Sequence, residues 1–232
     1  TGINKIAKIS REFGLGLPTG LNLPGEKGGL IPDRDWKLRE KQTVWRPGET
    51  IIAGIGQGYV LVTPMQLALM TARIANGGKK IIPTLIKHDG KISNNFLNTV
   101  ISKDNLNIIK KAMESVTLDE FGTGRTFRLG KKGVEMAGKT GTVQVRRIST
   151  TERESEEGII KNEDRIWEWR DHALYVGYAP MEKPKYAISV IVEHGGSGSS
   201  KAGPIARDIM EVTLQDDPTK FIPRNPIQKP IV

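Results

Sequence analysis

The first half of the chain carries apolar residues at the spacing of amphipathic helices. This spacing recurs in three segments, 2–13, 65–75 and 102–116. Thr63 stands where a helix cap is expected and Pro64 where the first helical residue is expected, while Gly14 follows the first segment as a stop signal. The pattern predicts three helices, together with a glycine-rich loop over 14–29 and a tight glycine turn over 54–59.

The second half of the chain changes to the pattern of strands. Apolar and β-branched residues are concentrated in three segments, 139–145, 172–179 and 186–192. A long charged connection at 146–171 separates the first segment from the second, and a proline turn at 180–184 joins the second to the third. Strands that follow one another without a crossover helix favour antiparallel pairing. We therefore predict an α+β fold in which an antiparallel sheet is packed with helices.

The remaining segments give weaker signals. Residues 33–48 hold Trp36 and Trp45 in a charged setting, which predicts a surface segment pinned by its indole rings. Residues 195–200 are predicted to be a flexible loop, and a final helix is predicted from Pro204. Three apolar residues of that helix are expected to face inward: Ile205, Ile209 and Val212.

Composition excludes several classes of site and partner. The 232 residues include no cysteine, which rules out disulfides, zinc ribbons and thiol catalysis. The three histidines, His88, His172 and His194, are not spaced as a metal pair, so we predict neither a metal site nor a cofactor. The net charge of +9 raises nucleic acid as a partner, but the basic residues are interleaved with acidic ones and lack a stacking pattern. We therefore expect a solvated basic surface and no nucleic-acid partner.

One stretch, 133–145, admits two chemistries. Its first part, 133–140, matches the phosphate-binding pattern Gly-x-x-x-x-Gly-Lys-Thr. Such a loop follows a buried strand and leads into a helix. Here Gly141 follows directly, and three of the next four residues are β-branched, which is unfavourable for a helix. A strand is therefore the better interpretation, and a nucleotide-binding module at 133–140 stays as an alternative.

As a strand, the stretch presents groups that suit an anionic ligand. Thr140 and Thr142 point to the same side of an extended backbone. Gly141 between them allows another backbone to approach closely, and Lys139 adds a positive charge. Backbone pairing, two hydroxyls and an ammonium together predict a peptide-like ligand that carries a carboxylate.

Five segments together resemble a known family. In chain order they are Phe13–Gly16, Thr19–Glu26, Gly54–Ala68, Ala137–Val145 and Arg170–Pro180. The second reads Thr-Gly-Leu-Asn-Leu-Pro-Gly-Glu, and the fourth contains Lys-Thr-Gly, the third motif of the serine acyl-transferases that bind penicillin. In this order the segments resemble a class B penicillin-binding protein. The Ile-Gly-Gln-Gly-Tyr and Arg-Asp-His segments are most similar to the elongation-type transpeptidases of that class, penicillin-binding protein 2.

The resemblance implies a D,D-transpeptidase with the β-lactamase type of fold. Such an enzyme cross-links peptidoglycan stem peptides through a serine acyl-enzyme, and β-lactams acylate the same serine. Carried over to this chain, Lys139 would supply positive potential and assist proton movement. Thr140 and Thr142 would bind the carboxylate of substrate or drug, with Gly141 between them in the substrate-binding strand. The backbone N–H of Thr142 would form half of the oxyanion hole.

The resemblance also implies partners and a location. Stem peptides and β-lactams are the expected ligands, and a membrane glycosyltransferase and other cell-elongation proteins are the expected partners. The expected location is the periplasmic face of the bacterial inner membrane. The chain has no run of eighteen apolar residues and does not open with a signal peptide, so the anchor is expected to lie outside it.

The sequence departs from the family at the nucleophile. The family's Ser-x-x-Lys motif is absent, because no serine has a lysine three residues later. Residues 93–95 match the second motif, Ser-x-Asn, but they follow the helix at 65–75 where the family has the motif before it. We expect both motifs upstream of this chain. Residues 1–217 would then be the C-terminal part of a transpeptidase domain, inactive alone, and 218–232 a proline-rich tail. A non-catalytic partner-binding module is the third alternative.

Overall fold

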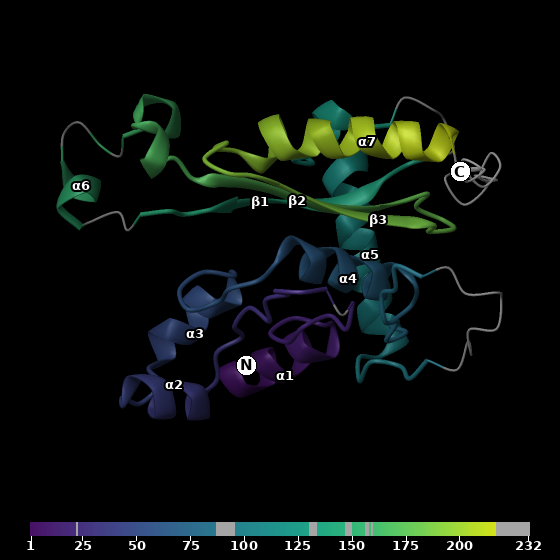
Figure 1. Cartoon of the computed structure of the whole chain (residues 1–232). Coiled ribbons are helices and arrows are strands. Elements are labelled where there is room, and N and C mark those ends of the chain that lie inside the picture. The colour runs from purple at the N-terminus through teal and green to yellow at the C-terminus, as the bar shows by residue number, and fades with distance from the viewer. Residues whose placement is uncertain are drawn as a thin grey trace, which may run out of the picture.

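A three-stranded antiparallel sheet lies at the centre of the computed structural model, with helices on both faces (Figure 1). The structure describes residues 1–21, 23–86, 96–129, 134–146, 150–155, 158 and 160–216. The strands are β1 (Ala137–Val143), β2 (His172–Ala179) and β3 (Tyr186–Val192), in the order β1-β2-β3. The predicted strands and the α+β class are confirmed. The expected tail at 218–232 lies outside the described residues, and so does the Ser-x-Asn match at 93–95.

Each face of β2 packs into its own apolar cluster, because alternate side chains of a strand point to opposite faces. On one face Tyr175 lies against Phe127 and the C-terminal helix α7 (Gly203–Gln215). On the other face Tyr178 lies against α4 (Pro64–Ala75) and α5 (Lys103–Leu118). Burial raises the pKa of Tyr178 to about 12 and raises that of Tyr175 as well. The sheet is therefore the middle of three layers.

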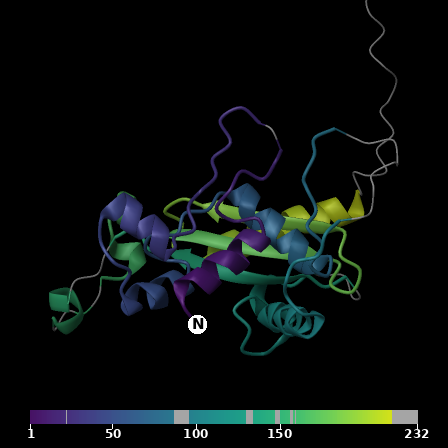
Figure 2. The same ribbon diagram turned by 90° about the horizontal axis from the view of Figure 1, so that it is seen from below.

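The helices before the sheet form at their predicted places. α1 spans Ile3–Glu12 and lies beyond α4 from the sheet (Figure 2). Thr63 caps α4 in a capping box with Gln66, and Ser102 caps α5. Gln66 is fully buried, and its side-chain amide donates to the carbonyls of Leu17 and Gly28 at 2.7 Å each. One polar side chain therefore holds the glycine-rich loop against α4.

The segment at 33–48 contains helix that the sequence pattern did not indicate. α2 spans Arg34–Lys41 with Asp33 as its cap, and α3 spans Pro47–Gly54. The two helices are joined by an ion pair, in which the Lys37 ammonium lies 2.6 Å from a carboxylate oxygen of Glu49. Caps and this ion pair stabilise α2, so apolar periodicity gives no sign of it. The indole of Trp36 does hold the segment in place, since it packs at an angle against Tyr59 with ring centroids 5.1 Å apart.

The charged connection after β1 contains short helical turns, α6 (Thr150–Glu154), Asn162–Asp164 and Trp167–Trp169. Asp171 ties them to the sheet. Its carboxylate accepts from Arg165 at 3.1 Å and from the backbone N–H of Val145 at 3.2 Å, and its own N–H donates to Asn162 at 2.8 Å. Among the described residues, no helix is long and apolar enough to cross a membrane.

The inward face of α7 differs from the prediction. Ile205, Ile209 and Val212 were expected to face the core, but these side chains are 42%, 49% and 60% exposed. The buried residues are instead Gly203, Ala206 and Met210. A Cβ on Gly203 would lie 2.4 Å from ring carbons of Phe127, so the start of the helix packs against that ring with no room for a side chain at this position. Apolar periodicity indicated the stripe of Ile205, Ile209 and Val212, whereas the packed stripe is Gly203, Ala206 and Met210.

The orientation of α7 can be tested with a pair of neighbouring substitutions. Met210→Ala removes a side chain that is 2% exposed and should lower the free energy of unfolding by about 2–4 kcal/mol through the cavity it leaves. Ile209→Ala, on the outer face, should lower it by less than about 1 kcal/mol. Chemical denaturation of the 232-residue chain measures both. Equal losses, or a larger loss for Ile209→Ala, would show that the helix faces the other way.

The Lys37–Glu49 pair predicts a pH dependence of stability. The hydrogen bond from Lys37 lowers the pKa of Glu49 in the folded protein. The stabilisation that the ionised Glu49 carboxylate contributes is therefore complete above the pKa of glutamate in the unfolded chain, about 4.3. It is lost as the pH falls through the pKa of Glu49 in the folded protein. The melting temperature of Glu49→Gln should consequently fall less steeply below pH 5 than that of the parent. Glu40→Gln, which changes an exposed carboxylate, is the control and should follow the parent.

Candidate functional site

The four residues predicted to bind substrate lie together on β1. Lys139, Thr140, Gly141 and Thr142 are the third to sixth residues of the strand and pair in register with 176 down to 173 of β2. Lys139 and Thr142 are exposed, while Thr140 and Gly141 are half-buried. Because β1 stands first in the strand order, its other edge has no strand beside it in the described part of the chain. The structure thus places the predicted residues at a sheet edge.

The carbonyls of Thr140 and Thr142 mark which backbone groups face that edge. The Thr140 carbonyl accepts from the Lys139 ammonium at 2.6 Å, and the Thr142 carbonyl accepts from the side-chain amide of Gln57 at 3.4 Å. In an antiparallel ladder the residues that bond across to the partner strand alternate with those that do not. The N–H and C=O of one extended residue point the same way, so the N–H groups of Thr140 and Thr142 face the outer edge too.

Two segments distant in sequence meet β1 at this edge. Gln57 lies in a turn flanked by Gly56 and Gly58, both with positive φ (78° and 75°). Thr123 lies in the turn after α5, and its hydroxyl is 2.9 Å from the hydroxyl of Thr140. Sequence reasoning assigned a site role to neither residue. The available signal was the glycine on each side, which frees the backbone to present one polar side chain.

The loop before α7 covers the backbone of β1. It was predicted to be flexible over 195–200, but Gly198–Ala202 forms a short π-helical turn, and Gly198 is buried. A Cβ on Gly198 would lie 2.5 Å from the carbonyl oxygen of Gly141 and 2.2 Å from that of Leu174. The backbone that approaches Gly141 closely in the structure is therefore that of Gly198, from the same chain. The residue that has to be glycine for this approach is Gly198, because Gly141 itself would only crowd Leu174 at 3.2 Å.

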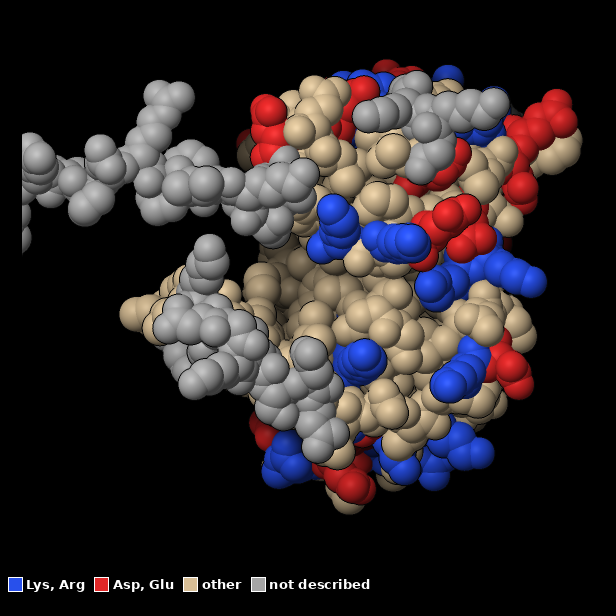
Figure 3. Space-filling model, turned by 90° about the vertical axis from the view of Figure 1, so that its right-hand side faces the viewer, with Lys and Arg blue, Asp and Glu red and all other residues tan. Residues whose placement is uncertain are grey.

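Charged side chains of both signs are found on the surface. On the face shown in Figure 3, which is the right-hand side of Figure 1, Lys and Arg are interspersed with Asp and Glu. Past the end of β1, Arg146 and Glu152 form an ion pair, and their hydrogen bond raises the pKa of the arginine and lowers that of the carboxylate. Among the residues that the structure describes, no three His, Asp or Glu side chains are grouped so that they could hold a metal ion.

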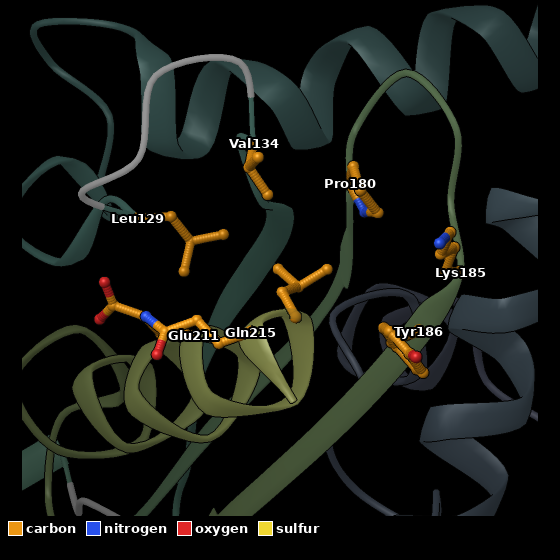
Figure 4. Close-up of a pocket in the computed structure, with 8 residues that line it drawn as sticks. Leu129, Val134, Pro180, Lys185, Tyr186, Glu211 and Gln215 are labelled. Carbon is orange, nitrogen blue, oxygen red and sulfur yellow. The ribbon is translucent and has the colours of Figure 1, made fainter. Parts of the chain in front are cut away.

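A separate, largely apolar pocket lies at the end of the sheet where β3 begins (Figure 4). Leu129, Val134, Tyr186 and Leu214 line it, near the C-terminal end of α7. Thr142 lies toward the other end of β1. The pocket is therefore distinct from the edge that carries Lys139 to Thr142, and we assign the candidate site to that edge.

The structure is against the nucleotide-binding alternative at 133–140. A P-loop requires a helix directly after its Lys-Thr pair, because the helix N-terminus binds the phosphates. Here Lys139 and Thr140 are in the middle of β1, which continues as a strand to Val143. Gly133, the first residue of the pattern, lies outside the described residues.

The chain is similar to known peptidoglycan transpeptidases. The Peptidoglycan D,D-transpeptidase MrdA of Haemophilus influenzae is 35% identical over 222 residues, which cover 92% of this chain and 33% of that protein. MrdA of Acinetobacter baumannii is 37% identical over 220 residues, covering 88% and 30%. The chain thus spans about a third of the length of the curated relatives it matches.

Solved structures show the same fold. PBP2 of Pseudomonas aeruginosa in complex with WCK 5153 matches with a TM-score of 0.75 and 36% identity, covering 96% of this chain and 44% of that one. PBP2 of Helicobacter pylori, solved as a complex with MreC, matches with a TM-score of 0.77 and 35% identity, covering 93% and 36%. The family model for the penicillin binding protein transpeptidase domain matches residues 1–211. The chain therefore belongs to the penicillin-binding protein transpeptidase-domain family.

Proposed function

We propose that this chain forms the substrate-binding wall of a peptidoglycan D,D-transpeptidase. The observation that carries the proposal is the outer edge of β1, where Thr140 and Thr142 turn their backbone groups away from β2. An extended peptide can pair with such an edge as an added strand. The relatives named Peptidoglycan D,D-transpeptidase support the same activity. A stem peptide is extended and ends in a carboxylate, which fits both features of the edge.

Each residue of the edge has a role in the proposed reaction. The N–H of Thr142 would donate to the oxyanion that forms when a serine attacks the peptide carbonyl, and such donors stabilise the charge of the transition state. The hydroxyls of Thr140 and Thr142 would bind the carboxylate of the substrate or of a β-lactam. Lys139 would add positive potential and assist proton transfer, and Gly141 would keep the strand narrow beside the ligand.

The nucleophile of the proposed reaction is outside this chain. No serine here is followed three residues later by lysine, so the serine would come from a Ser-x-x-Lys motif in an upstream part of the protein. We propose that residues 1–217 are the C-terminal part of the transpeptidase domain and are inactive alone. The protein would act at the periplasmic face of the inner membrane. Because one relative was solved with MreC, we propose elongation proteins as partners, among them a membrane glycosyltransferase.

Labelling with a fluorescent penicillin tests the proposal. The intact protein with its upstream serine should form a covalent adduct that survives denaturing electrophoresis, because the acyl-enzyme is an ester. The 232-residue chain should stay unlabelled under the same conditions. Covalent labelling of the chain alone would contradict the placement of the nucleophile. An unlabelled intact, folded protein would favour the alternative of a non-catalytic partner-binding module.

The role of Thr142 can be separated from stability. In the intact protein, Thr142→Ala should slow acylation by a carboxylate-bearing β-lactam about tenfold or more, because a hydrogen bond to a charged group is lost. The free energy of unfolding should change by less than about 0.5 kcal/mol, since the side chain is exposed. Thr142→Ser, which keeps the hydroxyl, is the matched control and should acylate at close to the parent rate. A fall in melting temperature with unchanged acylation would contradict the assignment.

A further inference from the structure

The hydroxyl of Thr123 makes a contact that the proposed function does not explain. Its Oγ1 lies 2.9 Å from Oγ1 of Thr140, and either hydroxyl can be the donor. Thr123 is exposed and Thr140 is half-buried, so water competes for both groups. A hydrogen bond between neutral groups in that setting contributes little to folding stability. The contact is nevertheless held in place by the structure around it.

The turn that carries Thr123 is fixed at both ends. The N–H of Gly124 donates to the carbonyl of Val116 at 2.7 Å, which closes the turn on the last part of α5. A Cβ on Gly122 would lie 2.4 Å from that same carbonyl oxygen, so the turn fits only with glycine at this position. The guanidinium of Arg128 donates to carbonyls at the end of α5, and Phe127 is fully buried in the core. Thr123 is therefore presented to β1 by a preorganised turn.

The same turn lies beside Lys139. Thr123, Phe121 and Lys139 line one open hollow between the end of α5 and β1. The Lys139 ammonium donates to the carbonyl of Thr140, so the strand, the ammonium and the two hydroxyls lie within one small region. An anion bound by Thr140 would be next to Thr123 as well.

The chemistry of a hydroxyl gives the contact a direction when an anion is present. A threonine hydroxyl has one proton to donate and two lone pairs to accept with. If Thr140 donates its one proton to a carboxylate, the 2.9 Å contact is kept only when the Thr123 hydroxyl donates a hydrogen bond to the Thr140 oxygen. Donors in such a chain strengthen one another. With the Thr140 proton directed at the anion, Thr123 acts as the donor of this hydrogen bond.

We propose that Thr123 is a positioning residue, which donates to the Thr140 hydroxyl and so directs the Thr140 proton at the carboxylate of the acyl donor. The inference rests on the proposed function and deepens it, because it adds a residue from outside the Lys-Thr-Gly strand to the recognition of the carboxylate. It predicts that Thr123 affects ligands that carry this carboxylate and spares ligands that lack it.

The test compares one β-lactam with its methyl ester, in the intact protein that carries the acylated serine. For Thr123→Val, which keeps the shape and removes the hydroxyl, acylation by the acid should slow about fivefold, the equivalent of one hydrogen bond. Acylation by the ester should keep the parent rate. The ratio of the acylation rate with the acid to that with the ester (the acid-to-ester ratio) should therefore fall. Thr123→Ser should restore the ratio. Thr126→Val, at an exposed position in the 3-10 turn Arg125–Phe127 that follows, is the matched control and should leave the ratio unchanged.

A double-mutant cycle with Thr140 separates this inference from the proposed function. Thr140→Val should itself lower the acid-to-ester ratio, and adding Thr123→Val should lower it no further, because the two hydroxyls act as one chain. Equal slowing of acid and ester by Thr123→Val would show a structural tether only and overturn the inference. So would additive effects in the double variant. A parent protein that no β-lactam acylates, or a Thr140→Val variant with the parent ratio, would instead overturn the proposed function.

Discussion

In the part of the chain that the structure describes, β1 pairs along one edge only, and the candidate site follows from this constraint. Register with β2 uses the backbone groups of alternate residues, which leaves those of Thr140 and Thr142 for the other edge. Two residues apart in a strand, they also share a face, so backbone donors and hydroxyls are spaced together. A shift of the register by one residue would turn the backbone groups of both threonines toward β2. Those of Lys139 and Gly141 would then face the outer edge. The chemistry of the edge is thus set by the pairing as much as by the residue types.

The packing around β1 keeps that edge rigid. The π-helical turn at Gly198 rests on the strand's backbone, and α7 follows it so closely that Gly203 has no room for a side chain against Phe127. On the other face α5 packs against β1, and a hydroxyl of Thr117 donates to the carbonyl of Met136 just before the strand. Donors that are fixed before the ligand arrives need no reorganisation when charge develops. The proposed binding edge is therefore held by close packing on both faces of β1.

Sequence reasoning reached the elements whose signals are local. The capped helix from Pro64, the three strands and the strand assignment of Lys139 to Thr142 all rest on neighbouring residues, and the structure has them in place. It missed α2, whose stability comes from a cap and an ion pair to Glu49, twelve residues beyond Lys37. It also turned α7 to the wrong face, since the close contact of Gly203 with Phe127 is a property of the packed structure.

The same limit explains why Gln57 and Thr123 were missed and why one motif could be read in two ways. Gln57 and Thr123 each reach β1 from a turn far away in sequence. Only the assembled fold shows that they meet the carbonyl of Thr142 and the hydroxyl of Thr140. Gly-Lys-Thr binds phosphate when the next residues form a helix, because successive N–H groups then converge on one point. In β1 the N–H groups alternate between two edges, so those on the outer edge form a row. A row of donors suits an extended chain that ends in an anion, and it is this geometry, more than the letters of the motif, on which we base the ligand proposed for Lys139 and Thr140.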